Sequence, residues 1–518
     1  MEDRKTFNLA LLLKNKSKLF PDKVALISGE KKITFGQLHQ LGLKCAAGLW
    51  ELTPCQPARI GIFLPNSWEY IVAYTAIFSL HFCAVPLDFM LSEEELTSIL
   101  KHAQVDILIA RRRININYDR LERDTGVKIV LVDETQETRE GDFLSFSQLI
   151  KNGAEEKAGA FIDNARGEEA IISYTSGTTG QPKAVVITYD NLEYSPRQVK
   201  YFLSDINEND NVLCAIPLSH AGGWVYFLLM VYFGLQVVLM ERFAPRQFLK
   251  NIEQFKITFF WIVPSMYVAL FTLKDLEGFN LKTLRYVVVF GAPSSPRLLK
   301  KFHKLCPQAK LLNGWGMTET SPPNIVTPPD SANIESIGVS SPDVEVKLVN
   351  EEGEEVKEGE VGELLIRGKA VFKGYYKNPS LNEASFTPEG FFRTGDLAYR
   401  DEKGFYYIAG RKKQMLKVGG EIVFLWEIEK ALSEHPAVQE CAAVGVSDRL
   451  RGEVPKVFIV SKENTEVKEE ELREFLKKKL AHFKIPHYFE FVKELPKTRS
   501  GKIAEGRLKH MAENRIKN

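Results

Sequence analysis

The chain has 518 residues, of which 44% are hydrophobic and 26% are charged, and its 68 Lys and Arg residues nearly balance its 67 Asp and Glu residues. This length exceeds what one hydrophobic core supports, so we expect several domains or subdomains. The balance of charge gives no general electrostatic reason to expect nucleic acid or an anionic membrane as a partner.

The N-terminal segment and the cysteines indicate where the protein works. Residues 1–20 hold only a short apolar run and no cleavage site of small residues, so no signal peptide is expected. The six cysteines are scattered, without a Cys-x-x-Cys pair or an adjacent histidine cluster. They indicate reduced, mostly buried thiols in a cytoplasmic protein rather than a disulfide framework or a zinc site.

Between residues 20 and 300, short runs of β-branched residues alternate with longer helical patterns. The clearest runs are residues 59–65, 105–110, 128–133, 236–243 and 284–293. Strands separated by helices are typical of βαβ units. We therefore predict an α/β fold with two subdomains, each built on a largely parallel sheet.

One apolar segment, residues 221–240, is nearly as long as a membrane-spanning helix, which needs about 20 residues. Gly222, Gly223 and Gly234 interrupt the segment, and Gln236 lies within it. Its last part has the composition of a buried strand. We therefore expect a buried helix followed by a buried strand, and a membrane span is the alternative.

The pattern changes after residue 330. Residues 345–368 alternate in polarity, with turn signals at Glu352-Gly353 and Glu358-Gly359, which predicts antiparallel strands in a barrel or sandwich. A small distorted β-barrel is the form expected here. From residue 425 onward the pattern runs helix, strand, strand, helix, strand. This order predicts a compact α+β unit at the C-terminal end.

Residues 174–188, YTSGTTGQPKAVVIT, form a Gly-rich stretch that could expose several backbone N–H groups to an anion. The stretch does not match the P-loop of nucleoside triphosphatases, because Lys183 is not adjacent to Gly180 and Ala184 replaces the hydroxyl that would hold Mg²⁺. By itself the stretch predicts either an anion-binding loop or a flexible surface turn.

Four further motifs follow this loop in order: FGAPSSP at 290–296, LNGWGMTET at 312–320, FFRTGDLAYRDEKGFYYIAGRKKQMLKVGGE at 391–421, and LPKTRSGKI at 495–503. Together with the loop they resemble the adenylate-forming superfamily, which includes acyl-CoA synthetases, firefly luciferases and nonribosomal peptide adenylation domains. The resemblance covers nearly the whole chain and is greatest to fatty acyl-CoA synthetases. It implies a large N-terminal domain, 1–411, and a small mobile C-terminal domain, 412–518, with a hinge near Lys413.

The resemblance also implies a reaction and the residues that perform it. A carboxylate attacks the α-phosphate of ATP, pyrophosphate leaves, and the thiol of coenzyme A then displaces AMP. Because two anions meet in the first step, neutralising their charge lowers the barrier. The resemblance places Thr175 and Glu319 at Mg²⁺, Lys183 at the β- and γ-phosphates, Thr318 at the α-phosphate, and Lys502 between carboxylate and phosphate.

The nucleoside and the second step have their own expected residues. Trp315 matches the aromatic residue that stacks on adenine, and Asp396 and Arg411 match the ribose contacts. Lys417 matches a lysine that contacts the nucleotide and serves the second half-reaction. The full ATP-binding set implied by the resemblance is Thr175, Ser176, Gly177, Thr178, Thr179, Gly180, Lys183, Gly291, Ala292, Asn313, Gly314, Trp315, Thr318, Asp396, Arg411, Lys413, Lys417 and Lys502.

The acid and the acceptor are less closely defined. Gly419 and Gly420 suit the close approach of coenzyme A. Gly316 stands where small-acid members carry tryptophan, which implies an open acyl pocket. No acidic residue lies between residues 217 and 224, which disfavours an amino acid substrate. The expected acyl pocket comprises His220, Gly222, Gly223, Trp224, Val263 and Gly316, although His220 would equally suit a packed core.

We therefore expect an ATP- and Mg²⁺-dependent acyl-CoA synthetase for a medium- or long-chain fatty acid. An aromatic acid is the alternative substrate. Leu425 and Trp426 replace residues common along the expected pantetheine path, which keeps an acyl carrier protein open as the acceptor. A ligase that stops at the adenylate, a non-catalytic nucleotide-binding relative and a peripheral membrane contact also stay open, and the sequence predicts no oligomeric state.

Overall fold

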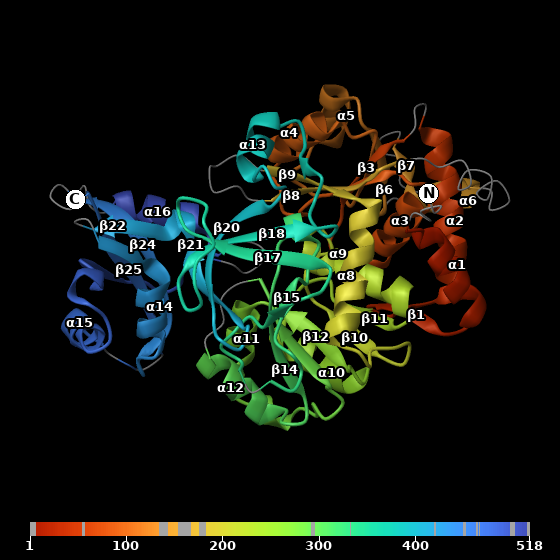
Figure 1. Cartoon of the computed structure of the whole chain (residues 1–518). Helices are drawn as coiled ribbons and strands as arrows, with labels where there is room; N and C mark the ends of the chain where they lie inside the picture. The colour runs from red at the N-terminus through yellow and green to blue at the C-terminus, as the bar shows by residue number, and fades with distance from the viewer. Residues whose placement is uncertain are drawn as a thin grey trace.

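The computed structural model describes residues 7–53, 57–133, 143–153, 167–175, 183–291, 296–331, 333–418, 421–448, 452–462, 465, 467–497 and 503–514. These residues form a large body and a smaller C-terminal unit that lies beside it (Figure 1). Two large sheets form the centre of the body, and the strands expected from the five β-branched runs are all present. The predicted α/β fold is therefore confirmed.

The first sheet has eight strands in the order β19-β9-β8-β4-β3-β5-β6-β7. The strands from β8 to β7 run parallel, while β8 pairs antiparallel with β9, and β9 with β19. The strands are β3 (Arg59–Phe63), β4 (Cys83–Pro86), β5 (Ile107–Ala110), β6 (Lys128–Leu131), β7 (Leu144–Ser145), β8 (Glu169–Thr175), β9 (Lys183–Thr188) and β19 (Gly374–Tyr375). The accompanying helices are α2 (Phe35–Leu52), α3 (Trp68–Ser79), α4 (Glu93–Ala103), α5 (Tyr118–Thr125) and α6 (Phe146–Asn152).

The second sheet has nine strands in the order β16-β15-β14-β13-β12-β10-β11-β1-β2, parallel from β14 to β1. The strands are β1 (Val24–Ser28), β2 (Lys31–Thr34), β10 (Asn211–Cys214), β11 (Gln236–Leu239), β12 (Phe259–Ile262), β13 (Tyr286–Val289), β14 (Lys310–Trp315), β15 (Ile325–Val326) and β16 (Val339–Ser340). The helices are α1 (Leu9–Leu19), α8 (Tyr189–Phe202), α9 (Ala221–Phe233), α10 (Pro245–Gln254), α11 (Pro264–Leu270) and α12 (Pro296–Leu305), with the short 3₁₀ helix η1 (Leu276–Gly278).

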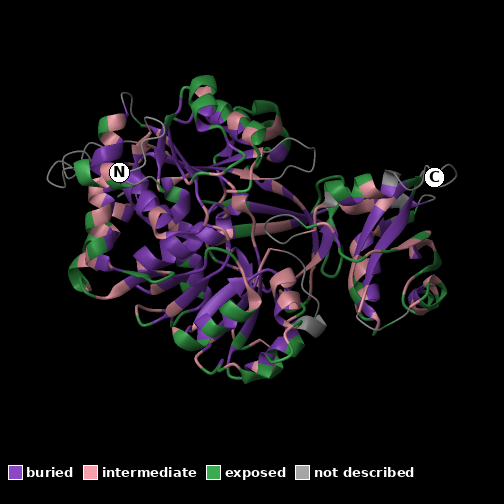
Figure 2. Ribbon diagram, turned by 180° about the vertical axis from the view of Figure 1, so that it is seen from behind, coloured by how far each residue is buried: buried purple, intermediate pink, exposed green. Residues whose placement is uncertain are grey.

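The apolar segment 221–240 forms helix α9 and strand β11, as predicted. Helix α9 is buried almost all around, and Gly234 ends it in a left-handed conformation. Its aromatic residues join those of α3 in the main hydrophobic core, where Tyr74 and Phe78 contact Phe227. Figure 2 shows buried residues concentrated in the central strands and helices, with exposed residues on the outer helices. No helix among the described residues is long and apolar enough to cross a membrane.

Antiparallel strands follow the second sheet, as predicted after residue 330. The four strands run in the order β17-β18-β20-β21, where the sequence places the small barrel. They are β17 (Val344–Val349), β18 (Gly362–Gly368), β20 (Phe392–Arg400) and β21 (Tyr406–Arg411), accompanied by helix α13 (Pro379–Ser385). Strand β21 ends at Arg411, so the small sheet leads directly into the C-terminal unit.

The C-terminal unit is a five-stranded sheet with helices and a hydrophobic core of its own. The predicted order helix, strand, strand, helix, strand is confirmed by α14 (Leu425–Ser433), β24 (Val438–Asp448), β25 (Gly452–Ser461), α15 (Glu469–Lys477) and β26 (Tyr488–Phe491). The remaining elements are η3 (Lys412–Gln414), β22 (Met415–Val418), β23 (Glu421–Phe424), η4 (His482–Lys484) and α16 (Glu505–Asn514). The boundary at residues 411 and 412 stays a prediction.

The five cysteines within the described ranges are free thiols. Four are buried, and Cys441 is partly exposed. This agrees with the reduced state expected from their scattered positions.

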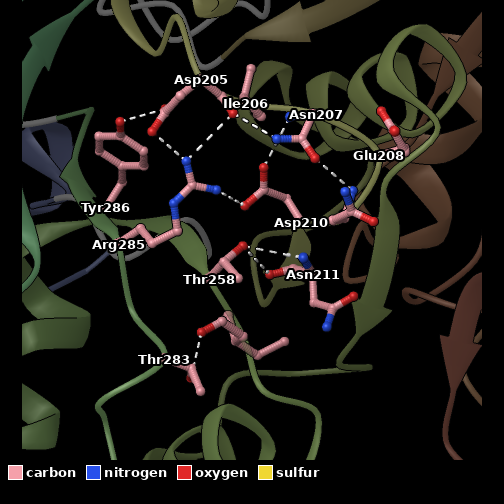
Figure 3. Close-up of polar contacts among 12 residues, drawn as sticks. Asp205, Ile206, Asn207, Glu208, Asp210, Asn211, Thr258, Thr283, Arg285 and Tyr286 are labelled. Atoms are coloured by element: carbon pink, nitrogen blue, oxygen red, sulfur yellow. Dashed lines mark hydrogen bonds and ion pairs between the residues drawn. The ribbon is translucent and has the colours of Figure 1, made fainter.

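A polar cluster joins the amino ends of β10 and β13 (Figure 3). Arg285 Nη1 lies 2.6 Å from Asp210 Oδ1 and its Nη2 lies 2.5 Å from Asp205 Oδ2. The Tyr286 hydroxyl donates to Asp205 Oδ1 at 2.5 Å. Asp210 is only 2% exposed, whereas the Arg285 side chain is 35% exposed. Arg285 therefore neutralises the buried Asp210 carboxylate at the amino ends of the parallel strands of the second sheet.

We predict that Arg285→Ala lowers the free energy of unfolding by about 2 kcal/mol, because it leaves the Asp210 carboxylate buried without its cation. The control is Arg246→Ala, which breaks an ion pair with Asp275 in which both side chains are about half exposed. Such exposed pairs contribute less than about 1 kcal/mol. Chemical denaturation measures both variants, and equal losses would contradict the importance assigned to the cluster.

Candidate active site

The two large sheets meet at the turn that follows β14. This turn contains Trp315 at the end of the strand and Glu319 in the short helix η2 (Thr318–Thr320). Across from it lie β9 and β19 of the first sheet. The backbone N–H of Phe372 donates to the Glu319 carbonyl at 2.8 Å and so ties the turn to the segment that enters β19.

A lysine, a glutamate and a tyrosine come together at this junction. The Tyr375 hydroxyl donates to Glu319 Oε1 at 3.1 Å. Lys183 Nζ lies 4.9 Å from the centre of the Tyr375 ring. Glu319 is only 6% exposed. The predicted pair Lys183 and Glu319 is thus brought to one place, with Tyr375 between them.

Burial sets the electrostatics of this cluster. It raises the pKa of the Glu319 carboxyl, although its own backbone N–H, the Tyr375 hydroxyl and two nearby cations, Lys183 and Arg411, pull that pKa down. Burial lowers the pKa of the Lys183 ammonium; Glu319 opposes this shift, and the positive charges of Lys413 and Arg411 add to it. One buried carboxylate therefore faces two cations, Lys183 and Arg411, and Lys413 adds a third positive charge near Lys183, an arrangement that suits an anionic ligand.

Thr175 ends β8 directly opposite Lys183, which begins β9. The Thr175 hydroxyl donates to the Lys183 carbonyl at 3.5 Å. Residues 176–182 lie outside the described part of the chain, so the predicted positions Ser176, Gly177, Thr178, Thr179 and Gly180 are not placed. The two ends of the predicted phosphate loop, Thr175 and Lys183, are placed, and they lie directly opposite each other.

Trp315, Asp396 and Arg411 form a second cluster. Trp315 Nε1 donates to Asp396 Oδ2 at 2.8 Å, and Arg411 Nε lies 2.9 Å from Asp396 Oδ1. Asp396 is 6% exposed and Trp315 is 8% exposed. Strands β20 and β21 place Asp396 directly across from Arg411, while β14 supplies Trp315. The sequence predicted all three at the nucleoside, and the structure brings them together.

The residues around Trp315 explain why small side chains are needed there. A Cβ atom at Gly314 would lie 2.3 Å from the Phe290 ring, so only glycine lets the two segments approach this closely. Gly291 follows Phe290 with a φ of +88°, which favours glycine. The Asn313 side chain donates to the Ser336 carbonyl at 3.0 Å, and this hydrogen bond ties β14 to the segment that precedes β16. Ala292 lies outside the described residues.

The expected acyl wall lies at the start of α9 and the carboxyl end of β12. Trp261 stacks on Tyr226 with ring centres 3.6 Å apart, and its Nε1 donates to the Gly222 carbonyl at 2.8 Å. His220 precedes α9, and Val263 follows β12. Trp224 is 1% exposed and packs in the main core, as Trp261 also does, and its place in the acyl pocket stays a prediction.

Gly223 and Gly316 are close-packed. A Cβ atom at Gly223 would lie 2.0 Å from the Pro217 carbonyl oxygen. At Gly316 it would lie 2.6 Å from Pro322 Cβ and 3.0 Å from Asn324 Oδ1. The sequence predicted that Gly316 leaves the pocket open. The structure adds that glycine is needed there because the chain folds back onto it.

The predicted C-terminal residues are only partly placed. Lys413 lies in η3, immediately after β21, and its charge reaches Lys183. Lys417 lies in β22, but its side chain is outside the described part. Gly419, Gly420 and Lys502 lie outside the described residues. Their roles stay predictions.

Tyr375 is the site residue that the sequence reasoning missed. It is the first of two tyrosines after Gly374 in a run of ordinary strand composition, and neither its spacing nor its charge distinguishes it from a core aromatic residue. The register of β19 against β9, in which Tyr375 lies opposite Val185, brings its hydroxyl to Glu319. A contact of this kind requires the tertiary structure.

The donor set agrees with a Mg²⁺ ion shared with a phosphate ligand. Mg²⁺ usually binds through one or two protein oxygens and completes its shell with phosphates and water. Glu319 supplies one buried carboxylate, and Thr175 supplies a hydroxyl at the mouth of the phosphate loop. No group of three or more His, Cys, Asp or Glu side chains suited to a metal occurs among the described residues, so these residues hold no cage made wholly of protein.

Comparison with known proteins agrees with this geometry. The family model for AMP-binding enzymes matches residues 13–376, and that for the C-terminal domain of AMP-binding enzymes matches residues 427–502. The long-chain-fatty-acid–CoA ligase of Bacillus subtilis is 30% identical, with 96% of this chain and 94% of that protein covered. The 2-succinylbenzoate–CoA ligase of Bacillus licheniformis is 32% identical, with 96% and 98% covered.

Solved structures give the same result. A crystal structure of the anthranilate CoA ligase AuaEII with anthranoyl-AMP superposes with a TM-score of 0.89 at 26% identity, covering 99% of this chain and 98% of that one. An O-succinylbenzoate CoA synthetase from Bacillus subtilis with ATP and magnesium gives 0.82 at 28% identity, covering 96% and 99%. This chain therefore belongs to the family of AMP-binding enzymes, and it is an adenylate-forming acid–thiol ligase.

Proposed function

We propose that this enzyme activates an apolar carboxylic acid with ATP through an acyl-adenylate and then transfers the acyl group to coenzyme A. One observation carries the proposal. The turn from Trp315 to Glu319 joins the Trp315–Asp396–Arg411 cluster to the Lys183–Glu319–Tyr375 cluster, so a single ligand with a nucleoside at one end and a polyphosphate at the other fits both.

In the first step a carboxylate oxygen of the acid bonds to the α-phosphorus of ATP, and the bond to pyrophosphate breaks. Lys183 and Arg411 offset the charge of the phosphates, and Thr318 contacts the α-phosphate. Glu319 and Thr175 would hold Mg²⁺, which when bound neutralises charge on the phosphate oxygens. The burial of Glu319 strengthens its interactions, because fixed charges act more strongly where water is excluded.

Asp396 holds the ribose in this proposal. Each carboxylate oxygen has two lone pairs, and Trp315 and Arg411 each occupy one site, on different oxygens. The remaining lone pairs can accept hydrogen bonds from the two ribose hydroxyls. The indole of Trp315, fixed by its bond to Asp396, then offers its ring to adenine.

In the second step the sulfur of coenzyme A bonds to the acyl carbon, and AMP leaves. We propose that Lys502 serves the first step, while Gly419, Gly420 and Lys417 serve the second, with a rotation near Lys413 between the two steps. The physical reason is that the lysine and the thiol would compete for the same face of the adenylate.

A medium- or long-chain fatty acid is the proposed substrate. The residues at the start of α9 and in β12 are apolar and mostly buried, and the long-chain-fatty-acid–CoA ligase of Bacillus subtilis is among the similar proteins. An aromatic acid is the second candidate. The stacked pair Trp261 and Tyr226 favours it, since a fixed flat aromatic surface beside Gly222 suits a planar ring.

Coenzyme A is the proposed acceptor, with an acyl carrier protein as the alternative. The buried free thiols support a cytoplasmic location. A peripheral membrane contact stays a proposal of the sequence alone.

Pyrophosphate release, measured with fatty and aromatic acids of graded size, with and without coenzyme A, tests the proposal. We expect release with one class of apolar acid and formation of the matching thioester with coenzyme A. No release with any acid would refute the enzyme reaction. Release that coenzyme A leaves unchanged, with no thioester formed, would favour a ligase that stops at the adenylate.

Tyr375→Phe tests the electrostatics of Glu319. Without the hydroxyl donor the pKa of the buried carboxyl should rise further, because a hydrogen bond that favours the ionised form is lost. Activity that needs ionised Glu319 is present above this pKa and lost as pH falls through it. The acidic limb of kcat/KM for ATP should therefore move to higher pH.

The neighbouring Tyr376→Phe is the matched control. The Tyr376 hydroxyl donates to Gln104 Oε1 at 3.2 Å and not to Glu319. Its pH profile should stay that of the unaltered enzyme. If both tyrosine variants shift the limb equally, the link between Tyr375 and Glu319 is wrong.

Lys502→Ala tests the two-step division of the C-terminal residues. We expect at least a hundredfold loss of pyrophosphate release, while thioester formation from supplied acyl-adenylate changes less than about threefold. Lys497→Ala, which removes a surface ion pair to Glu440 in the same segment, should leave both steps intact. Equal loss of both steps in Lys502→Ala would count against the rotation.

A further inference from the structure

The turn that bears Glu319 lies on a buried polar layer that the proposed reaction does not use. Thr320, Ser321 and Asn324 are each 0% exposed although all are polar. Burying such groups is costly unless their hydrogen bonds are satisfied. The partners of this layer therefore decide where the turn lies.

Gln198 is the residue to which this layer is bound. It comes from the middle of α8, a separate element of the chain, and is also 0% exposed. Its Nε2 donates to the Ser321 carbonyl at 3.1 Å. Its Oε1 accepts from Asn324 Nδ2 at 3.1 Å and from the Ser341 hydroxyl at 2.9 Å. The opposite orientation of the amide would set two NH₂ groups against each other, so the network fixes this one.

Asn324 links Gln198 to the earlier part of the turn through hydrogen bonds to Thr320 and Trp315. Its Nδ2 also donates to the Thr320 carbonyl at 2.7 Å, and its Oδ1 accepts from the Thr320 hydroxyl at 2.5 Å. Its backbone N–H donates to the Trp315 carbonyl at 3.1 Å. The side-chain amides of Gln198 and Asn324 thus hold residues 320 and 321, directly after Glu319, and the Asn324 backbone N–H ties them to Trp315, four residues before it.

Ser321 shows that the turn needs support from outside. It has a φ of +44°, a left-handed conformation that costs energy for a residue other than glycine. Its hydroxyl is buried without a hydrogen-bond partner among the described residues, so its own side chain does not hold this conformation. The hydrogen bond from the Gln198 side chain to the Ser321 carbonyl supports this conformation from outside the turn.

We propose that Gln198 is a positioning residue of this ligase, which fixes the turn so that the Glu319 carboxylate faces Lys183 and the metal site. This inference rests on the proposed role of Glu319. The position requires an amide, because the side chain must donate to a carbonyl and accept from an amide and a hydroxyl at once. An ionised glutamate would be unable to donate, and its carboxylate would face the Ser321 carbonyl oxygen.

A double-mutant cycle separates positioning from general stability. The variants are Gln198→Met, which keeps the volume and removes every polar atom, Glu319→Gln, and their combination. We expect Gln198→Met to lower kcat for pyrophosphate release at least tenfold. If Gln198 acts through Glu319, the combined variant should be no more than about threefold slower than Glu319→Gln alone. Losses that multiply would overturn the proposal.

Binding of ATP provides a readout that does not depend on turnover. Calorimetry of ATP with and without Mg²⁺ gives the factor by which Mg²⁺ tightens binding. Gln198→Met and Gln198→Glu should both reduce the Mg²⁺-dependent tightening of ATP binding at least fivefold. Their values should approach the tightening measured for Glu319→Gln. Gln247→Glu is the matched control, because Gln247 lies exposed on α10 and bonds only locally, to Asn251. A factor unchanged in both Gln198 variants would refute the positioning role.

The two proposals can fail separately. If the unaltered enzyme releases no pyrophosphate with any acid, the proposed function is wrong, and calorimetry still tests Gln198. If the unaltered enzyme is active and the Gln198 variants match it, only the positioning role is wrong. The charged Gln198→Glu carries the greater risk to folding, so Gln198→Met, checked by thermal denaturation, is the decisive variant.

Discussion

Burying one carboxylate at the junction of two sheets is the constraint on which the site depends. An ionised carboxylate is stable in a water-poor place only if cations and hydrogen-bond donors replace its hydration. Glu319 obtains them from Lys183, Tyr375 and Arg411, which belong to β9, β19 and β21. The carboxylate therefore joins two sheets, the eight-stranded sheet that holds β9 and β19 and the four-stranded sheet that holds β21, to the turn that follows β14.

The fold supplies these partners through strand pairings between distant parts of the chain. Strand β19 is only two residues long, yet its pairing with β9 places Tyr375 beside Lys183. The hairpin of β20 and β21 places Asp396 opposite Arg411, next to the end of β14. The antiparallel pair β9 and β19 at the edge of the first sheet, and the hairpin of β20 and β21 in the separate four-stranded sheet, thus bring the functional side chains together.

The sequence predicted more of the architecture than of the contacts. Periodicity and turn signals identified the strands and the buried helix α9, because buried elements show a regular spacing or a continuous run of apolar residues. The resemblance to the adenylate-forming superfamily identified Trp315, Asp396 and Arg411, because each lies in one of its motifs. Tyr375 and Gln198 left no such trace. An aromatic residue in a strand and an amide in a helix are common, and only their partners make them important.

The sequence also gave an incomplete reason for Gly316. The sequence prediction was that glycine at residue 316 leaves the acyl pocket open, because a larger side chain there would block the acid. The structure shows a second reason, because a larger side chain would also overlap with Pro322 and Asn324. Local patterns do not report such close approaches, because Pro322 and Asn324 reach Gly316 only after the chain has turned back.

The packing at Gly316 has an evolutionary consequence. A Cβ atom there would overlap with Pro322, so a larger side chain at residue 316 is compatible with the fold only if residue 322 or 324 changes as well. The fitness of a substitution at one position then depends on the residue at another. A lineage that altered its acid preference through residue 316 would have to pass through a compensating change first, which makes this preference epistatic and slow to drift.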